Sequence, residues 1–272
     1  MPELLDDWRD RMAAHEARAD TLTRDHLARR QHHEKHPVYD FLFEYYPVRP
    51  SHLRRWHPGL GRVLPGRTPH AEWRDYHFDG DTTAVDVSAL WERRGESLLY
   101  IRDLLHRTNL NPAHFDCFGL HEGAMVYRTD TPRHDLPLRL GAAGSDAVVE
   151  KHRIRCTHFD AFRFFTPAAR PLNLTVLERE DQPANDQAGC VHATMDLYKW
   201  ASKLGPLVPG ELFLDCFDLA VDARVLDMEA SPYDCRAHGF GVVAIETPEG
   251  KAEYVERQRD LRSVGVRVEP HL

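Results

Sequence analysis

The chain has 272 residues, 42% of them hydrophobic and 29% charged, and its formal net charge at pH 7 is −8. This is the composition of a globular protein with a substantial core, and the acidic balance argues against nucleic acid as the main partner. The five cysteines show no Cys-x-x-Cys spacing, and no apolar run reaches membrane length. We therefore expect a cytoplasmic protein without a disulfide framework, a zinc knuckle or a membrane segment.

The predicted fold class is mainly α, a single helical domain with a small strand or loop layer around residues 115–165. Residues 3–34 are predicted to form a charged helix with only sparse apolar contacts, such as Leu4 and Trp8. We accordingly expect a charged N-terminal helical arm at residues 1–34, followed by a single helical catalytic domain at residues 35–272.

A second helix is predicted from His36 to Tyr46, with Pro37 at its first position. Its residues His36, Asp40 and Glu44 are spaced four apart and therefore project from one face. A line of these residue types on an otherwise aromatic helix could supply metal ligands, or it could be a solvated stripe. Glu44 is kept as a candidate ligand.

Residues 58–86 are rich in glycine, proline and charged side chains, so we expect an irregular excursion there. Helical periodicity returns between residues 85 and 110, where Leu90, Leu98 and Leu105 are among the apolar positions. We interpret this second segment as a scaffold helix.

An adjacent pair, His121 and Glu122, follows among small and aromatic residues. Neighbouring side chains face different directions in a helix and in a strand. We therefore expect at most one of the two to enter a given site.

Residues 152–165 combine two histidines, an aspartate, three arginines and four phenylalanines, a mixture that is typical of a pocket wall. In a strand, His158 and Asp160 would point to the same side, as the His-x-Asp part of a two-histidine, one-carboxylate iron site requires. In a helix, Ile154, His158 and Phe162 would form a stripe instead. Alternatively, the two polar residues form a hydrogen-bonded structural pair and the arginines pair with carboxylates.

A helix is predicted at residues 190–203, in which His192 and Asp196 are an i,i+4 pair. The last helix is expected to begin at Thr247, as its N-cap, and Pro248, as its first residue.

The longest predicted helix, at about residues 211–229, is apolar around most of its circumference. Such a helix is usually central, so Asp215 and Asp222 on one row are candidates for burial. A buried carboxylate there would need a metal, hydrogen bonds or an arginine, for which Arg155 and Arg163 are the candidates.

Histidine and carboxylate side chains thus occur together in four separate segments of a chain that holds 18 histidines. The first hypothesis is a metalloenzyme of oxygenase or hydrolase type, with non-haem iron as the preferred metal and manganese or zinc as alternatives. Its substrate would be a small molecule, with an anionic one favoured by the arginines. The assigned residues are His158, Asp160, His192, Asp196 and Glu44 as metal ligands, Asp215 as a further ligand or a base beside the metal, and Arg155 or Arg163 as substrate anchor.

Four strings carry a resemblance to a known family: Phe41-Leu-Phe-Glu-Tyr-Tyr46, Leu53-Arg-Arg-Trp-His-Pro-Gly59, Cys156-Thr-His-Phe-Asp-Ala-Phe-Arg163 and Met195-Asp-Leu-Tyr-Lys-Trp200. Over nearly the whole chain, the sequence resembles actinobacterial proteins of about this length that are labelled 3-methyladenine DNA glycosylase. The resemblance implies hydrolysis of the N-glycosidic bond to an alkylated base, without a cofactor.

The second hypothesis is therefore a metal-free DNA glycosylase or a related N-glycoside hydrolase, and nucleic acid is a partner only in this case. Asp160 or Asp227 would stabilise an oxocarbenium-like centre or activate water, and aromatic side chains would stack on the base. The third hypothesis is a helical binding protein without enzymatic activity, in which the excess of histidine is incidental.

Overall fold

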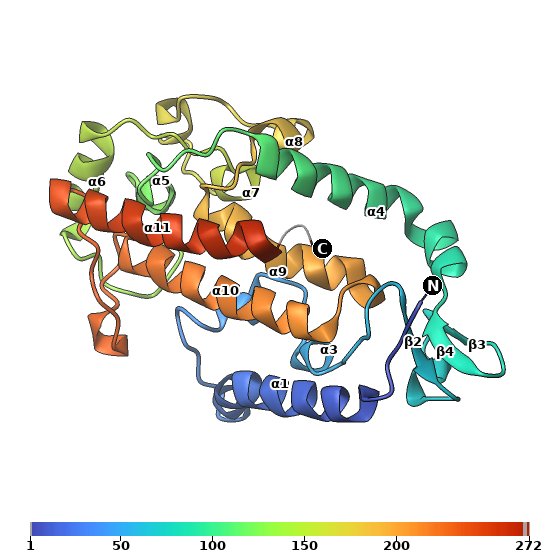
Figure 1. Cartoon of the computed structure of the whole chain (residues 1–272). Coiled ribbons are helices and arrows are strands. Elements are labelled where there is room, and N and C mark those ends of the chain that lie inside the picture. Colours follow the sequence, from blue (N-terminus) through green and yellow to red (C-terminus); the bar gives the residue numbers. More distant parts are fainter. Residues whose placement is uncertain (1, 269–270, 272) are drawn as a thin grey trace. The chain divides into compact units, whose positions relative to one another are not determined.

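The computed structural model describes residues 2–268 and residue 271. Within this part of the chain the fold is mainly α-helical, with eleven α-helices and one small four-stranded sheet (Figure 1). The predicted fold class, mainly α with a small strand layer, is confirmed. The described residues form two compact units, the first from residues 2–103, 197–218, 268 and 271, and the second from residues 104–196 and 219–267. The predicted boundary near residue 34 stays a prediction.

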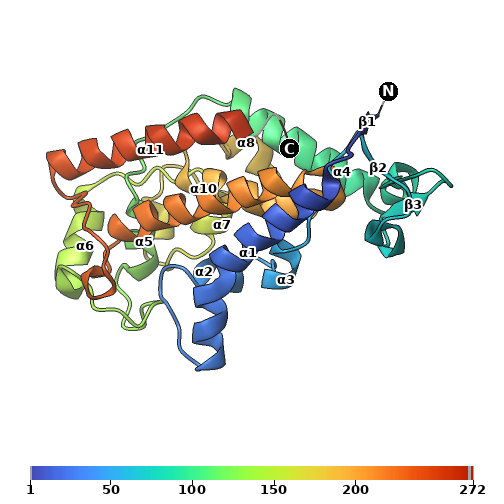
Figure 2. The same ribbon diagram turned by 60° about the horizontal axis from the view of Figure 1, so that its bottom comes forward.

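Several helices belong wholly or partly to the first unit. They are α1 (Trp8–Gln31), α2 (Phe41–Glu44), α3 (Pro50–Leu53), most of α4 (Val87–Leu110), the second part of α9 (Val191–Leu204) and the first part of α10 (Gly210–Glu229). Helix α1 buries one face through Trp8, His15 and Ala19. It lies beside the first part of α10 (Figure 2), where Arg18 forms an ion pair of 2.8 Å with Asp215.

The sheet also belongs to the first unit and has the order β1-β2-β4-β3, from strands β1 (Glu3–Leu4), β2 (Arg62–Pro65), β3 (Tyr76–Phe78) and β4 (Thr82–Val85). Strands β2, β3 and β4 are antiparallel, whereas β1 pairs with β2 in parallel. The prediction of an irregular segment at residues 58–86 is therefore wrong, because three strands of the sheet lie within it. β-Branched residues favour the pleated conformation, and the fully buried Thr83 donates its hydroxyl to the Gly66 carbonyl at 2.8 Å.

The second unit contains α5 (Leu120–Val126), α6 (Gly141–Lys151), α7 (Phe159–Phe162), α8 (Gln182–Asn185), the first part of α9, the second part of α10 and nearly all of α11 (Pro248–Val268). The strands thus lie outside residues 115–165, which consist of short helices and loops with one isolated bridge between Ile154 and Asn173. Short 3-10 helices occur at Pro69–Glu72, Arg170–Leu172, Arg179–Asp181, Gly205–Leu207 and Arg236–His238.

The core of the second unit lies where α11 runs alongside the second part of α10, as Figures 1 and 2 both show. Leu226 from α10 and Tyr254 from α11 are both buried in it. Helix α11 begins as predicted: the Gly250 amide donates to the Thr247 hydroxyl at 3.0 Å, and Pro248 is the first helical residue.

The predicted helix from His36 to Tyr46 is shortened to α2. The amides of Val38 and Tyr39 donate to the His36 imidazole Nδ1 at 3.3 and 3.1 Å, and the His36 amide donates to the Asp40 carboxylate at 2.8 Å. These local bonds stabilise a turn in place of the first helical turns. Only Phe41–Glu44 of the predicted helix is therefore α-helical.

The predicted burial of Asp215 and Asp222 on α10 is also wrong, because both side chains are exposed. The buried carboxylate of this helix is Asp227, whose side chain has no exposed surface. Among the described residues, no helix is both long enough and apolar enough to cross a membrane.

His70 in the first unit makes a pH-dependent contribution to stability. Its ring is fully buried among aromatic side chains, including Trp56 and Trp73, and Nε2 lies 3.2 Å from the Trp56 carbonyl. Burial lowers the pKa of His70 to about 4, although the carbonyl bond raises it slightly. A histidine with a lowered folded-state pKa stabilises the fold above its unfolded pKa near 6.5, and this contribution is lost as the pH falls.

We predict that the free energy of unfolding falls by about 1–2 kcal/mol between pH 7 and pH 5 through His70 alone, because this ring takes up a proton in the unfolded chain but not in the folded protein. Urea unfolding at both pH values measures this loss. The His70→Gln variant should show a smaller loss than the wild type, and His32→Gln, which changes an exposed ring, should match the wild type. Equal losses in wild type and His70→Gln would contradict this account.

Candidate metal centre

Four side chains of the second unit, His121, Glu122, His192 and Asp227, form a compact group of potential metal ligands. One ligand atom from each lies within 4.8 Å of those of the other three. They come from α5, the first part of α9 and the second part of α10. Two imidazoles and two carboxylates at this spacing could hold a metal ion.

Helix α5 supplies two members of the group. His121 and Glu122 are only 1% and 5% exposed. The expectation that at most one of them would enter a site is wrong. Successive side chains in a helix are rotated by about 100°, and the longer glutamate side chain can reach the same space as its neighbour.

Helix α10 supplies the third member, Asp227, whose carboxylate forms hydrogen bonds with two side chains. His121 Nε2 lies 2.8 Å from Asp227 Oδ1, and Arg224, which precedes Asp227 by three residues, donates from Nη1 to Asp227 Oδ2 at 2.8 Å. The same guanidinium nitrogen is 3.8 Å from Glu122 Oε1. These side chains are almost completely shielded from solvent, so their charges interact strongly.

The pKa values of the two carboxylates are moved in opposite directions. Burial disfavours the charged form of Asp227, yet the hydrogen bond from His121 and the charge of the Arg224 guanidinium hold its pKa well below the ordinary range. Burial and the charge of Asp227 raise the pKa of Glu122, which Arg224 and His121 only partly offset. A further positive charge in the group would therefore stabilise the ionised form of Glu122.

The two histidines of the group also differ. Burial alone would lower the pKa of His121, but its bonds to Asp227 and Cys117 outweigh this and raise it well above the ordinary value. Burial and the nearby His121 lower the pKa of His192 well below the ordinary value. His192 is therefore held as a neutral imidazole, the form that binds metal ions.

His158 packs behind His192, with the two rings stacked at a centroid distance of 5.4 Å. The amide of Ala161 donates to His158 Nδ1 at 3.3 Å, so His158 caps the N-terminus of α7. The proton consequently lies on Nε2, which donates to Asp196 Oδ2 at 3.2 Å. This buried pair supports one face of the His192 ring.

Among the sequence-predicted ligands, the structure places only His192 in the group of four. His158 and Asp196 lie next to it and bind each other. Asp160, two residues after the cap of α7, forms ion pairs with Arg163 at 3.3 Å and Arg179 at 3.2 Å. The strand interpretation of His-x-Asp is wrong, because the segment is a helix cap in which side chains two residues apart diverge.

The remaining predicted site residues have other partners. Arg155 donates to Asp116 at 2.8 Å, and Arg163 pairs with Asp160, as the alternative interpretation of the arginines predicts. Asp215 is exposed in the first unit and pairs with Arg18. Their assigned roles as substrate anchors and as a base stay predictions.

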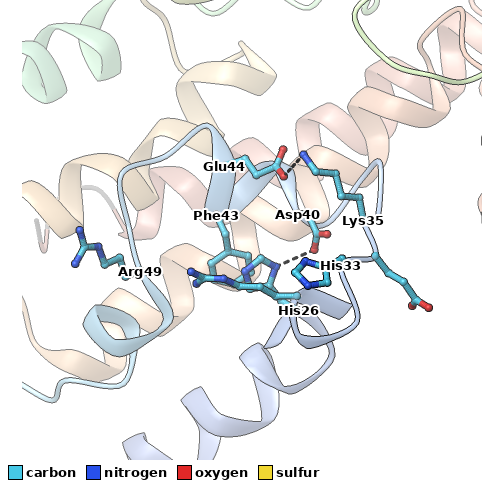
Figure 3. A pocket seen from close by; sticks show the side chains of 9 residues that line it. His26, His33, Lys35, Asp40, Phe43, Glu44 and Arg49 are labelled. Carbon is cyan, nitrogen blue, oxygen red and sulfur yellow. Dashed lines mark hydrogen bonds and ion pairs between the residues drawn. The ribbon is translucent and has the colours of Figure 1, made fainter. Parts of the chain in front are cut away.

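Glu44 lies in the first unit, on a hollow of about 630 Å³ (Figure 3). Its carboxylate forms an ion pair of 2.8 Å with Lys35. In the same hollow, Asp40 is held by His26 at 2.9 Å and by Arg29 at 2.6 Å. Glu44 thus belongs to a different set of side chains from His192.

Three members of the group, His121, Glu122 and Asp227, were not assigned as ligands from the sequence. From the adjacent pair, the sequence predicts at most one site residue. A sequence signal for Asp227 does exist: Arg224 and Asp227 are spaced three apart on a helix that is apolar nearly all round. Oppositely charged residues at that spacing on a buried helix indicate a paired internal charge.

Comparison of the chain with protein-family models, with curated proteins and with solved structures finds no match.

We predict that Asp227→Asn lowers the free energy of unfolding of the metal-free protein by about 3–5 kcal/mol, because it leaves Arg224 buried beside His121 without a carboxylate. The matched control is Asp215→Asn, which removes an exposed ion-pair partner on the same helix and should cost less than about 1 kcal/mol. Urea unfolding in the presence of a chelator measures both. Similar losses in the two variants would rule out a special role of the Asp227 charge.

Proposed function

We propose that this protein is a metal-dependent enzyme whose centre is built by His121, Glu122, His192 and Asp227. The observation that carries the proposal is the convergence of two imidazoles and two carboxylates in one buried group. The preferred metal is iron, because mixed imidazole and carboxylate donors suit non-haem iron, and manganese or zinc are alternatives with the same donor types. The metal would supply a Lewis acid or a redox centre for a small-molecule substrate.

The neighbouring side chains support this proposal through the charges that they carry. Arg224 balances Asp227, so adding a divalent cation to two carboxylates and one guanidinium leaves one net positive charge. Such an excess would favour an anionic substrate. The predicted anchors Arg155 and Arg163 are partly exposed and could exchange their carboxylate partners for such a substrate.

The packing around the ligands supports the same proposal. His158, fixed by Asp196 and by the cap of α7, stacks against His192 and limits the rotation of its ring. Metal sites depend on such supporting contacts, because they hold each ligand in the orientation that the metal requires. The chain's own contribution is thus to orient the ligands and to exclude water from around them.

We predict close to one equivalent of iron, manganese or zinc in protein purified without an affinity tag and without a chelator. His192→Ala should lose this metal while its helical circular dichroism is kept, because it removes one ligand from α9. The control is Glu44→Gln, which changes an exposed carboxylate of the first unit and should keep the full metal content. Absence of metal from the wild type, even after incubation with each ion, would refute the proposal.

The second candidate function is the metal-free N-glycoside hydrolase that the family resemblance implies. The observation that favours it is Asp227, a fully buried carboxylate that its neighbours hold ionised. Such a fixed negative charge could stabilise an oxocarbenium-like centre.

If this second function is correct, the metal-free protein should release free base from alkylated DNA. Asp227→Asn should abolish this release, and Asp215→Asn should retain it. Release that persists unchanged in Asp227→Asn, or that requires an added metal, would exclude it.

A further inference from the structure

Cys117 contacts the imidazole nitrogen of His121 that faces away from Asp227. Its Sγ lies 3.4 Å from His121 Nδ1, whereas His121 Nε2 lies 2.8 Å from Asp227 Oδ1. The two ring nitrogens therefore have separate partners. Nε2 points to the neighbouring ligand of the group, and Nδ1 points to the thiol.

The backbone between Cys117 and α5 has an unusual conformation. Phe118 has a φ of 49° and Gly119 a φ of 74°, so two successive residues occupy the left-handed region. This is unfavourable for a side chain such as phenylalanine and persists only where the surroundings enforce it. The turn brings the thiol to the imidazole four residues later.

Packing holds this turn in place. A Cβ atom added at Gly119 would lie 3.2 Å from the Cβ of Ala230 and 3.4 Å from the Tyr254 ring, so the backbone is pressed against neighbouring segments. The Phe118 ring contacts Tyr254 edge-on, with a centroid distance of 6.4 Å. Both left-handed residues are thus fixed by the core of the second unit, and the position of Cys117 is fixed with them.

We infer that Cys117 is a positioning residue for His121 at the metal centre, an inference that rests on the proposed metalloenzyme function. A histidine that binds a metal through Nε2 carries its proton on Nδ1, and the partner of that proton sets the orientation of the ring. In the metal-bound state the Nδ1–H of His121 would donate to the Cys117 sulfur, which lies 3.4 Å from Nδ1. The thiol occupies the place that a carboxylate or a backbone carbonyl takes in most metal-binding histidines.

The test measures cobalt binding to the full chain, which is stripped of metal and then titrated with Co²⁺ against a competing chelator. Loss of such a supporting contact weakens metal binding by about 10- to 100-fold. Cys117→Ala and the similarly sized, apolar Cys117→Val should both show this loss and a changed visible Co²⁺ spectrum. Cys117→Ser should recover most of the affinity, because its hydroxyl can accept the same proton.

Cys216→Ala is the control, because it removes a buried thiol from the first unit and should bind Co²⁺ like the wild type. Wild-type affinity and spectrum in both Cys117→Ala and Cys117→Val would overturn the positioning role and leave the metal centre intact. A sulfur-to-cobalt charge-transfer band that disappears in these variants would also overturn it, because Cys117 would then be a ligand. A wild type that binds no Co²⁺, iron, manganese or zinc would overturn the proposed function together with this inference.

Discussion

The second unit depends on keeping the charge of Asp227 inside the protein. A carboxylate without exposed surface is tolerated only when neighbouring groups compensate its lost hydration, and here His121 and Arg224 do so directly. Arg224 is itself buried and also approaches Glu122, so the two carboxylates share one guanidinium. Helices α5 and α10 are therefore joined by charge as well as by apolar packing, and the candidate centre lies at that junction.

Long periodic segments could be predicted from the sequence, and short ones could not. The helices at residues 87–110 and 210–229 agree with the expected ones, because many apolar positions recur at helical spacing. The last helix begins at Pro248, as the capping Thr247 indicates, but it continues to Val268, beyond the expected end near Arg262. The sheet was missed because its strands are two to four residues long, too short for alternation to be recognised among glycines and prolines. The first part of the helix expected from His36 is a turn in the structure. The hydrogen bonds between side chains and backbone that stabilise this turn cannot be recognised from the periodicity of apolar residues.

The candidate centre was predicted only in part for a related reason. His192 could be identified, because its i,i+4 relation to Asp196 is local and belongs to one helix. The partners that complete the group come from other segments, 35 to 71 residues away in sequence from His192, and spacing along the chain carries no information about such contacts. The structure places His158 beside His192 as the cap of α7, and a residue that caps a short helix cannot be distinguished by pattern from one in a strand.

Burial within the group of four would also determine how quickly a bound metal ion could be exchanged. His121, Glu122 and Asp227 are buried, whereas His192 is partly exposed. Because the α5 and α10 ligands are buried, exchange of an ion held there would be slowed by the local opening that exposes them. Stripping and reloading of the ion would then both be slow, and both would require long equilibration.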